Sequence, residues 1–160
     1  MSDLKVNTIK TDTIEGSTAA ATVKLPAGHI IQTITNTDTS TVSTSSSSAS
    51  DLITASISPK FSNSVIHIEG YISRMAITFG SSNAYASLYI TNSSDTALTT
   101  GVLGSSGHSN SSPMSIFATD SPSSTSSQTY KIRLSTASGG TSSTTSDGQR
   151  YTIKLTEIAQ

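Results

Sequence analysis

The chain has 160 residues, of which 33% are hydrophobic and only 12% are charged, and its formal net charge is -1 at pH 7. This balance argues against binding to duplex nucleic acid or to an anionic membrane, and it differs from the charge-rich composition of disordered chains. Ser and Thr supply 61 residues, and the absence of cysteine excludes disulfides and thiolate metal sites. We therefore expect one compact domain with an appendage, stabilised by packing and assembly.

The first 23 residues are predicted to be an extended attachment segment rather than a domain. They repeat a short pattern, "NTIK" and then "DTIE", but they contain too few apolar side chains to build a core. We expect this segment to lean on copies of itself or on another protein. It has no apolar signal sequence, and no stretch of the chain approaches the roughly 20 apolar residues of a membrane helix, so we expect synthesis in the cytoplasm. The few apolar residues of this attachment segment are Leu4, Val6, Ile9, Ile14 and Val23.

The stretch "KLPAGHIIQ", residues 24–32, is predicted to be a junction. Pro26 fixes its own φ and pushes Leu25 towards an extended conformation, while Gly28 can adopt a positive φ, so the chain bends here. From Ile30 onwards apolar residues alternate as in a strand. His29 is interpreted as a capping or hydrogen-bonded residue at the bend. The alternative, in which copies of it meet at a symmetry axis and bind an anion or a metal, is less favoured, and we predict no metal site.

Residues 36–50 are rich in Ser and Thr and read as a linker or a long surface loop. From residue 51 to residue 160, short runs of period two alternate with clusters of Gly, Asn, Asp, Pro and Ser, which predicts an all-β fold with an antiparallel β-sandwich. The apolar parity changes between "SVIHIEGYI" and "MAITF", which indicates a bulge near Ser73 and Arg74 or burial of both faces. The faces predicted to point inward are Ile53, Ala55, Ile57; Ile66, Ile68, Ile72; Ala84, Ala86, Leu88, Ile90; Met114, Ile116, Ala118; Tyr130, Ile132, Leu134; and Tyr151, Ile153, Leu155.

The sequence offers no pattern that predicts catalysis. The "GSSGH" stretch that ends at His108 lacks the spacing of a nucleophile elbow. His67 and Glu69 share a strand face, where they form either an acid–base pair or, as we favour, an interface or solvated pair. The acidic residues stand singly, without calcium-loop or glycosidase spacing. We predict that the protein is not an enzyme and needs no cofactor.

Several segments together resemble a group of small virion structural proteins of tailed bacteriophages, particularly those of marine cyanobacterial phages. They are "LKVNTIKT" near the start, "LPAGHIIQ" at the junction, the Ser/Thr-rich stretch, "SVIHIEGYIS", and "YTIKLTEIAQ" at the end. The resemblance implies a homotrimer on the virion surface, attached to another virion protein through residues 1–35. It also implies a knob of jelly-roll type over residues 51–160, and no catalytic residues.

Alternation along one strand predicts where the knob subunits meet. Tyr85 and Tyr89 oppose the inward face of their strand, and Tyr71 opposes the inward face of another, so a monomer would leave these rings in water. Tyrosine is enriched at interfaces, and we assign the three to the trimer interface.

Three classes of function stay open: a fibre or knob for host adsorption through a surface glycan or protein, a protein that decorates or cements the capsid, and a carbohydrate-binding module.

Overall fold

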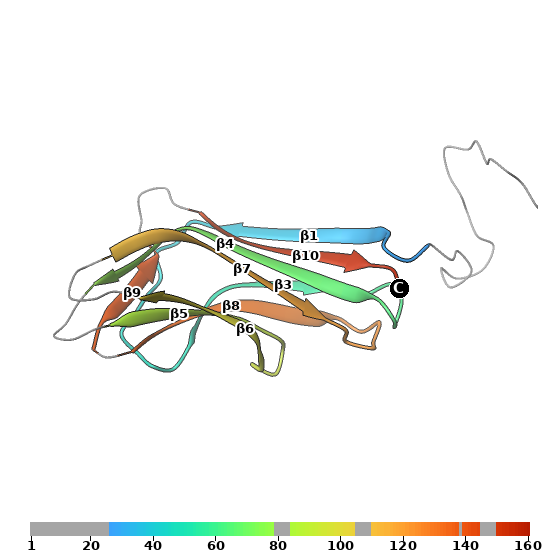
Figure 1. Ribbon diagram of the computed structural model, residues 1–160. Helices are drawn as coiled ribbons and strands as arrows, with labels where there is room; N and C mark the ends of the chain where they lie inside the picture. The colour runs from blue at the N-terminus through green and yellow to red at the C-terminus, as the bar shows by residue number, and fades with distance from the viewer. Residues whose placement is uncertain (1–25, 79–83, 105–109, 138, 145–149) are drawn as a thin grey trace, which may run out of the picture.

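The computed structural model describes residues 26–78, 84–104, 110–137, 139–144 and 150–160. Over these residues the chain forms strands and turns and no helix, and the strands pack as two layers (Figure 1). The strands are β1 (Ile30–Asp38), β2 (Ser43–Thr44), β3 (Ser50–Ile57), β4 (Val65–Thr78), β5 (Tyr85–Thr91), β6 (Ala97–Gly104), β7 (Asn110–Asp120), β8 (Gln128–Ala137), β9 (Thr141–Thr144) and β10 (Tyr151–Ile158).

The first layer, sheet A, is organised around the long strand β4. One side of β4 pairs with β7, and the other side pairs first with β10 and then with β9. Beyond these, β1 pairs with β10 and β2 pairs with β9. Since β1 and β2 follow each other along the chain, as do β9 and β10, each pair behaves as one interrupted strand.

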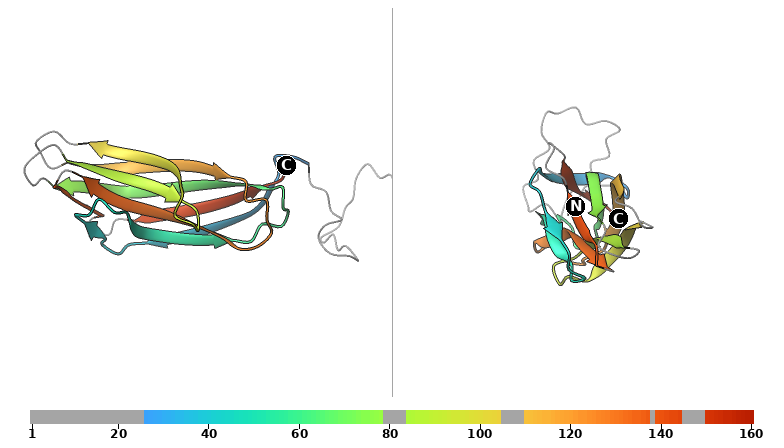
Figure 2. Two further views of the ribbon diagram at one scale, coloured as in Figure 1. Left: turned by 90° about the horizontal axis from the view of Figure 1, so that it is seen from below. Right: turned by 90° about the vertical axis from the view of Figure 1, so that its left-hand side faces the viewer.

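The second layer, sheet B, has the order β3-β8-β5-β6, and all its pairs are antiparallel. When each interrupted strand is counted once and the strands are numbered along the chain, the order of neighbouring strands is 1-8-3-6 across sheet A and 2-7-4-5 across sheet B. This is the strand order of a jelly roll. The predicted all-β antiparallel sandwich is confirmed, and Figure 2 shows it from below, where its elongated form is visible, and end-on.

The core lies between the two layers and is built by the predicted alternation. Of the residues predicted to face inward, all are buried except Met114 and Ala118, which are partly buried. The predicted bulge is also present, because the register of β4 against β7 shifts between Ile72 and Met75. The extra residue reverses the parity of the strand, so that both Ile72 and Met75 point into the core.

Residues 36–50 differ from the predicted linker or loop, because polar hydrogen bonds hold them to the sandwich. They include the end of β1 and all of β2. The Asn36 side-chain amide donates to the Thr54 carbonyl at 2.8 Å. On β8, Thr136 donates its N–H to the Ser46 carbonyl at 2.8 Å and its hydroxyl to the Thr44 carbonyl at 3.0 Å. The sandwich therefore begins at β1 and not at residue 51, and these bonds leave no apolar pattern in the sequence.

Candidate functional site

The junction and the last residues of the chain lie at the same end of the sandwich (Figure 1). The Gly28 N–H donates to the Ala159 carbonyl at 2.9 Å, and the Ala159 N–H donates to the His29 carbonyl at 2.9 Å. Gly28 has a φ of 88°, in the left-handed region that glycine tolerates, so the bend predicted after Pro26 is present. Ile30, which opens β1, is 66% exposed. The other predicted attachment residues, Leu4, Val6, Ile9, Ile14 and Leu25, lie outside the described residues.

A buried carboxylate ties this end together. Glu157 on β10 is fully buried, and its Oε1 accepts hydrogen bonds from the Lys60 N–H and the Ser64 hydroxyl at 2.7 Å each and from the Phe61 N–H at 3.3 Å. Its Oε2 accepts from the Gln32 amide at 2.6 Å. Every one of these donors is neutral, so hydrogen bonds take the place of a counter-ion. Glu157 thereby joins β10, β1 and the turn before β4, a role that the sequence pattern does not reveal.

The three tyrosines assigned to the trimer interface lie on opposite faces of the sandwich. Tyr85 and Tyr89 are on β5 and point away from the core on sheet B, whereas Tyr71 points away from the core on sheet A. Tyr85 and Tyr71 are exposed, and Tyr89 is half-buried with its hydroxyl 3.2 Å from Ser135 Oγ. No single flat patch contains all three, and their assignment to an interface stays a prediction.

Two further apolar residues that are more than half exposed were not predicted from the sequence. Val102 on β6 lies opposite Ser87 on the outer face of sheet B and is 58% exposed. Phe117 on β7 lies on the outer face of sheet A and is 63% exposed. The outward orientation of Phe117 could have been predicted from alternation, because its neighbour Ile116 faces inward. That of Val102 could not, because the apolar residues of β6 do not alternate and the strand was not predicted.

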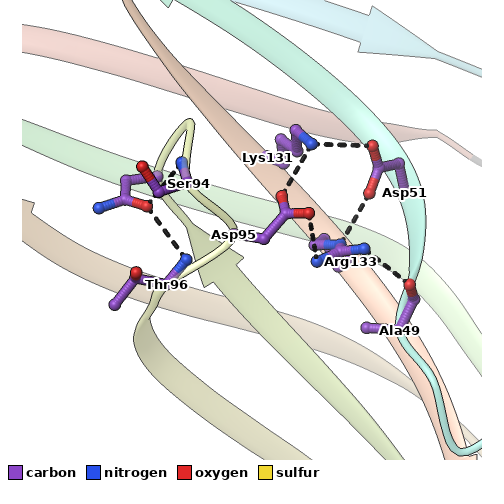
Figure 3. Close-up of polar contacts among 8 residues, drawn as sticks. Ala49, Asp51, Ser94, Asp95, Thr96, Lys131 and Arg133 are labelled. Carbon is purple, nitrogen blue, oxygen red and sulfur yellow. Dashed lines mark hydrogen bonds and ion pairs between the residues drawn. The ribbon is translucent and has the colours of Figure 1, made fainter.

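A network of four charged residues lies on the outer face of sheet B (Figure 3). Lys131 Nζ lies 3.3 Å from Asp51 and 2.8 Å from Asp95, and Arg133 bridges the same two carboxylates at 2.7 and 3.2 Å. The hydrogen bond from Lys131 lowers the pKa of Asp95 and raises the pKa of Lys131 itself. Two acids and two bases cancel, so the network joins β3, β8 and the turn after β5 without presenting net charge.

An open groove of about 300 Å³ lies between β4 and β7. His67, opposite Thr119, lines one side, and Glu69, opposite Phe117, lines the other. Glu69 accepts a hydrogen bond from the Lys154 ammonium of β10 at 2.9 Å. The groove therefore combines an exposed aromatic ring, a carboxylate–ammonium pair, an imidazole and a hydroxyl.

The described residues show neither a candidate metal site nor a helix that could span a membrane. Among them, no group of three or more His, Cys, Asp or Glu residues is placed to hold a metal ion. The same residues form no helix long and apolar enough to span a membrane. His108 lies outside the described residues. The absence of catalysis remains a prediction.

No protein family model matches the chain, and no curated protein matches it either. Among solved structures, the VP2 capsid protein of infectious bursal disease virus in T=1 particles aligns over 91% of this chain and 40% of its own, with 12% identity and a TM-score of 0.41. The VP2 subviral particle of the same virus aligns over 79% and 39%, with 14% identity and a TM-score of 0.34. The chain thus spans about two fifths of the length of these viral proteins.

A spore appendage of Bacillus that forms disulfide-linked pili aligns over 86% of this chain and all of its own, with 13% identity and a TM-score of 0.35. The present chain has no cysteine with which to form such links. All these similarities are at low identity and low TM-score.

Proposed function

We propose that this protein is a non-enzymatic structural component of a virion surface, a jelly-roll knob attached through its N-terminal segment. The observation that carries the proposal is the junction. Gly28 and His29 of the junction, which follows the attachment segment, are hydrogen-bonded to Ala159 at one end of an elongated sandwich. An anchor at that end leaves both outer faces and the far end of the sandwich accessible. The sequence resemblance to small tailed-phage virion proteins points the same way.

The proposed assembly is a homotrimer of the fibre or knob type. In a cyclic trimer every contact joins two different surfaces, so each subunit uses one surface towards one neighbour and a second surface towards the other. A two-fold dimer instead uses the same surface of both subunits. Exposed aromatic side chains on two opposite faces, Tyr71 on one and Tyr85 on the other, fit the cyclic arrangement. The three strands β5, β6 and β7 together contain one charged residue, Asp120. Since β6 and β7 are edge strands of their sheets, this edge of the sandwich is poor in charge, which favours association with another copy.

Gold-labelled antibody against the sandwich, applied to intact virions and viewed by electron microscopy, tests the proposal. A few labelled sites at the tail support a fibre or knob for host adsorption. Uniform label over the shell supports the alternative, a capsid-decorating or cementing protein. Particles that contain none of the protein, while infected cells contain it, contradict a virion role altogether.

A truncation tests the attachment segment separately. Deletion of residues 1–23 leaves every described strand intact, so the shortened protein is expected to keep the circular dichroism and thermal midpoint of the full chain. It is expected to be missing from virions assembled in its presence. Normal incorporation of the truncated protein would contradict the attachment role.

A further inference from the structure

The groove on the outer face of sheet A has the composition of a ligand site rather than of a solvated sheet surface. Three side chains from three neighbouring strands form one row across the sheet, in the order Lys154, Glu69, Phe117. The next row brings His67 opposite Thr119. Glu69 and Phe117 of the first row and both residues of the second row line the groove, and Lys154 reaches it through its hydrogen bond to Glu69. The groove volume of about 300 Å³ is at the lower limit of small-molecule sites.

An aromatic side chain borders the row that contains Glu69. Phe117 lies directly opposite Glu69 on the adjacent strand and lines the groove. It is 63% exposed, which leaves a ring surface available to a ligand. An aromatic ring beside a charged pair suits a ligand with one apolar face and several polar groups.

The charges at the groove limit the class of ligand. Lys154 and Glu69 neutralise each other at 2.9 Å, with 43% and 46% of their side chains exposed. No excess positive charge is left for a phosphate or another anion, which arginine or lysine clusters bind. A nucleic acid would require an excess of positive charge, whereas the formal net charge of the chain is -1. A ligand for this pair must be uncharged and must both donate and accept hydrogen bonds, as adjacent sugar hydroxyls do.

We propose that this groove binds a neutral saccharide. Phe117 stacks against the apolar face of a sugar ring. The Glu69 carboxylate accepts a hydrogen bond from one hydroxyl while the Lys154 ammonium donates to its neighbour. His67, on the other side of the groove, supplies a further polar contact. An open groove of this volume suits one or two sugar units of a longer glycan.

This inference extends the proposed role in host adsorption, but it rests on the chemistry of the groove alone. A virion protein without a saccharide site would still be labelled on particles. A saccharide-binding protein absent from virions would still bind sugar. Failure of the two proposals is therefore distinguishable.

The experiment uses the purified full-length chain and a panel of neutral oligosaccharides of glucose, galactose, mannose and N-acetylglucosamine. Saturation-transfer NMR at millimolar sugar detects binding, and titration of the labelled protein locates it. At least one class is expected to bind, with amide shifts confined to residues 67–71 of β4, residues 115–119 of β7 and Lys154. Absence of binding by the whole panel, or shifts clustered elsewhere, would overturn the proposal.

Variants separate the groove from the rest of the surface. Phe117→Ala is expected to weaken binding about tenfold, as the loss of one stacked ring does, and Glu69→Gln is expected to weaken it several-fold. Val102→Ala, which shortens an exposed apolar side chain on the opposite layer, should leave the affinity unchanged. Equal loss of sugar binding in all three variants would overturn the assignment. It would also be overturned if Phe117→Ala weakened self-association and left sugar binding unchanged.

Discussion

Replacing Glu157 by Gln is expected to lower the free energy of unfolding by about 2–4 kcal/mol. The new amide group must point its nitrogen at one of two sets of donors. In the place of Oε1 it meets the Lys60 N–H, the Phe61 N–H and the Ser64 hydroxyl, all of which need an acceptor. That orientation would leave several donors unsatisfied in a buried site.

The other orientation is less costly but still destabilising. In the place of Oε2 the amide nitrogen faces the Gln32 amide, which must turn over and give up its 2.8 Å hydrogen bond to the Ser58 carbonyl. That bond is worth about 1 kcal/mol, and each bond that changes from a charged to a neutral acceptor loses about 1 kcal/mol more. The lower desolvation of a neutral side chain offsets part of the loss, which gives the stated range.

Urea denaturation followed by circular dichroism measures the effect, with all proteins at one concentration because an oligomer's stability depends on concentration. Glu69→Gln is the matched control. It makes the same chemical change in sheet A, but breaks an ion pair whose side chains are 43% and 46% exposed, and it should cost no more than about 1 kcal/mol. If the two variants unfold with the same free energy, the reasoning about the buried carboxylate is wrong.

Three further outcomes are expected. The full-length double variant Tyr85→Lys, Tyr89→Lys should sediment as a monomer where the wild type is a trimer; an unchanged trimer would refute the interface, and a wild-type monomer at micromolar concentration would refute the trimer. Because the hydrogen bond from Lys131 lowers the pKa of Asp95, their interaction stabilises the fold above the ordinary carboxyl range and is lost as the pH falls through the lowered pKa. The thermal midpoints of wild type and Asp95→Asn should therefore differ at neutral pH and converge well below pH 3.8, and a difference independent of pH would contradict this account. Gly70→Ala places a Cβ 2.7 Å from two core isoleucine side chains and should cost about 1–3 kcal/mol in the urea assay, whereas a neutral effect would show that the core yields easily.

The sequence alone predicted the features that depend on local chemistry. The two-residue period of a strand determines which side chains share a face, and so identified nearly the whole core, including the change of parity between Ile72 and Met75. The conformational limits of Pro26 and Gly28 located the bend at the junction. Alternation also identifies outward residues, so it correctly predicted that Tyr71, Tyr85 and Tyr89 face away from the core.

Only the tertiary structure decided which strands are neighbours and where polar residues are buried. Asn36 and Thr136 bind strands together through hydrogen bonds that leave no hydrophobic period, so β2 and the end of β1 resembled a linker. Glu157 looks like an ordinary polar strand residue until four donors from distant segments converge on it. The groove likewise requires Glu69 and Phe117, which lie far apart along the chain, to be paired. Alternation gives each strand its inner and outer face, but long-range pairing determines which outer faces combine into a site.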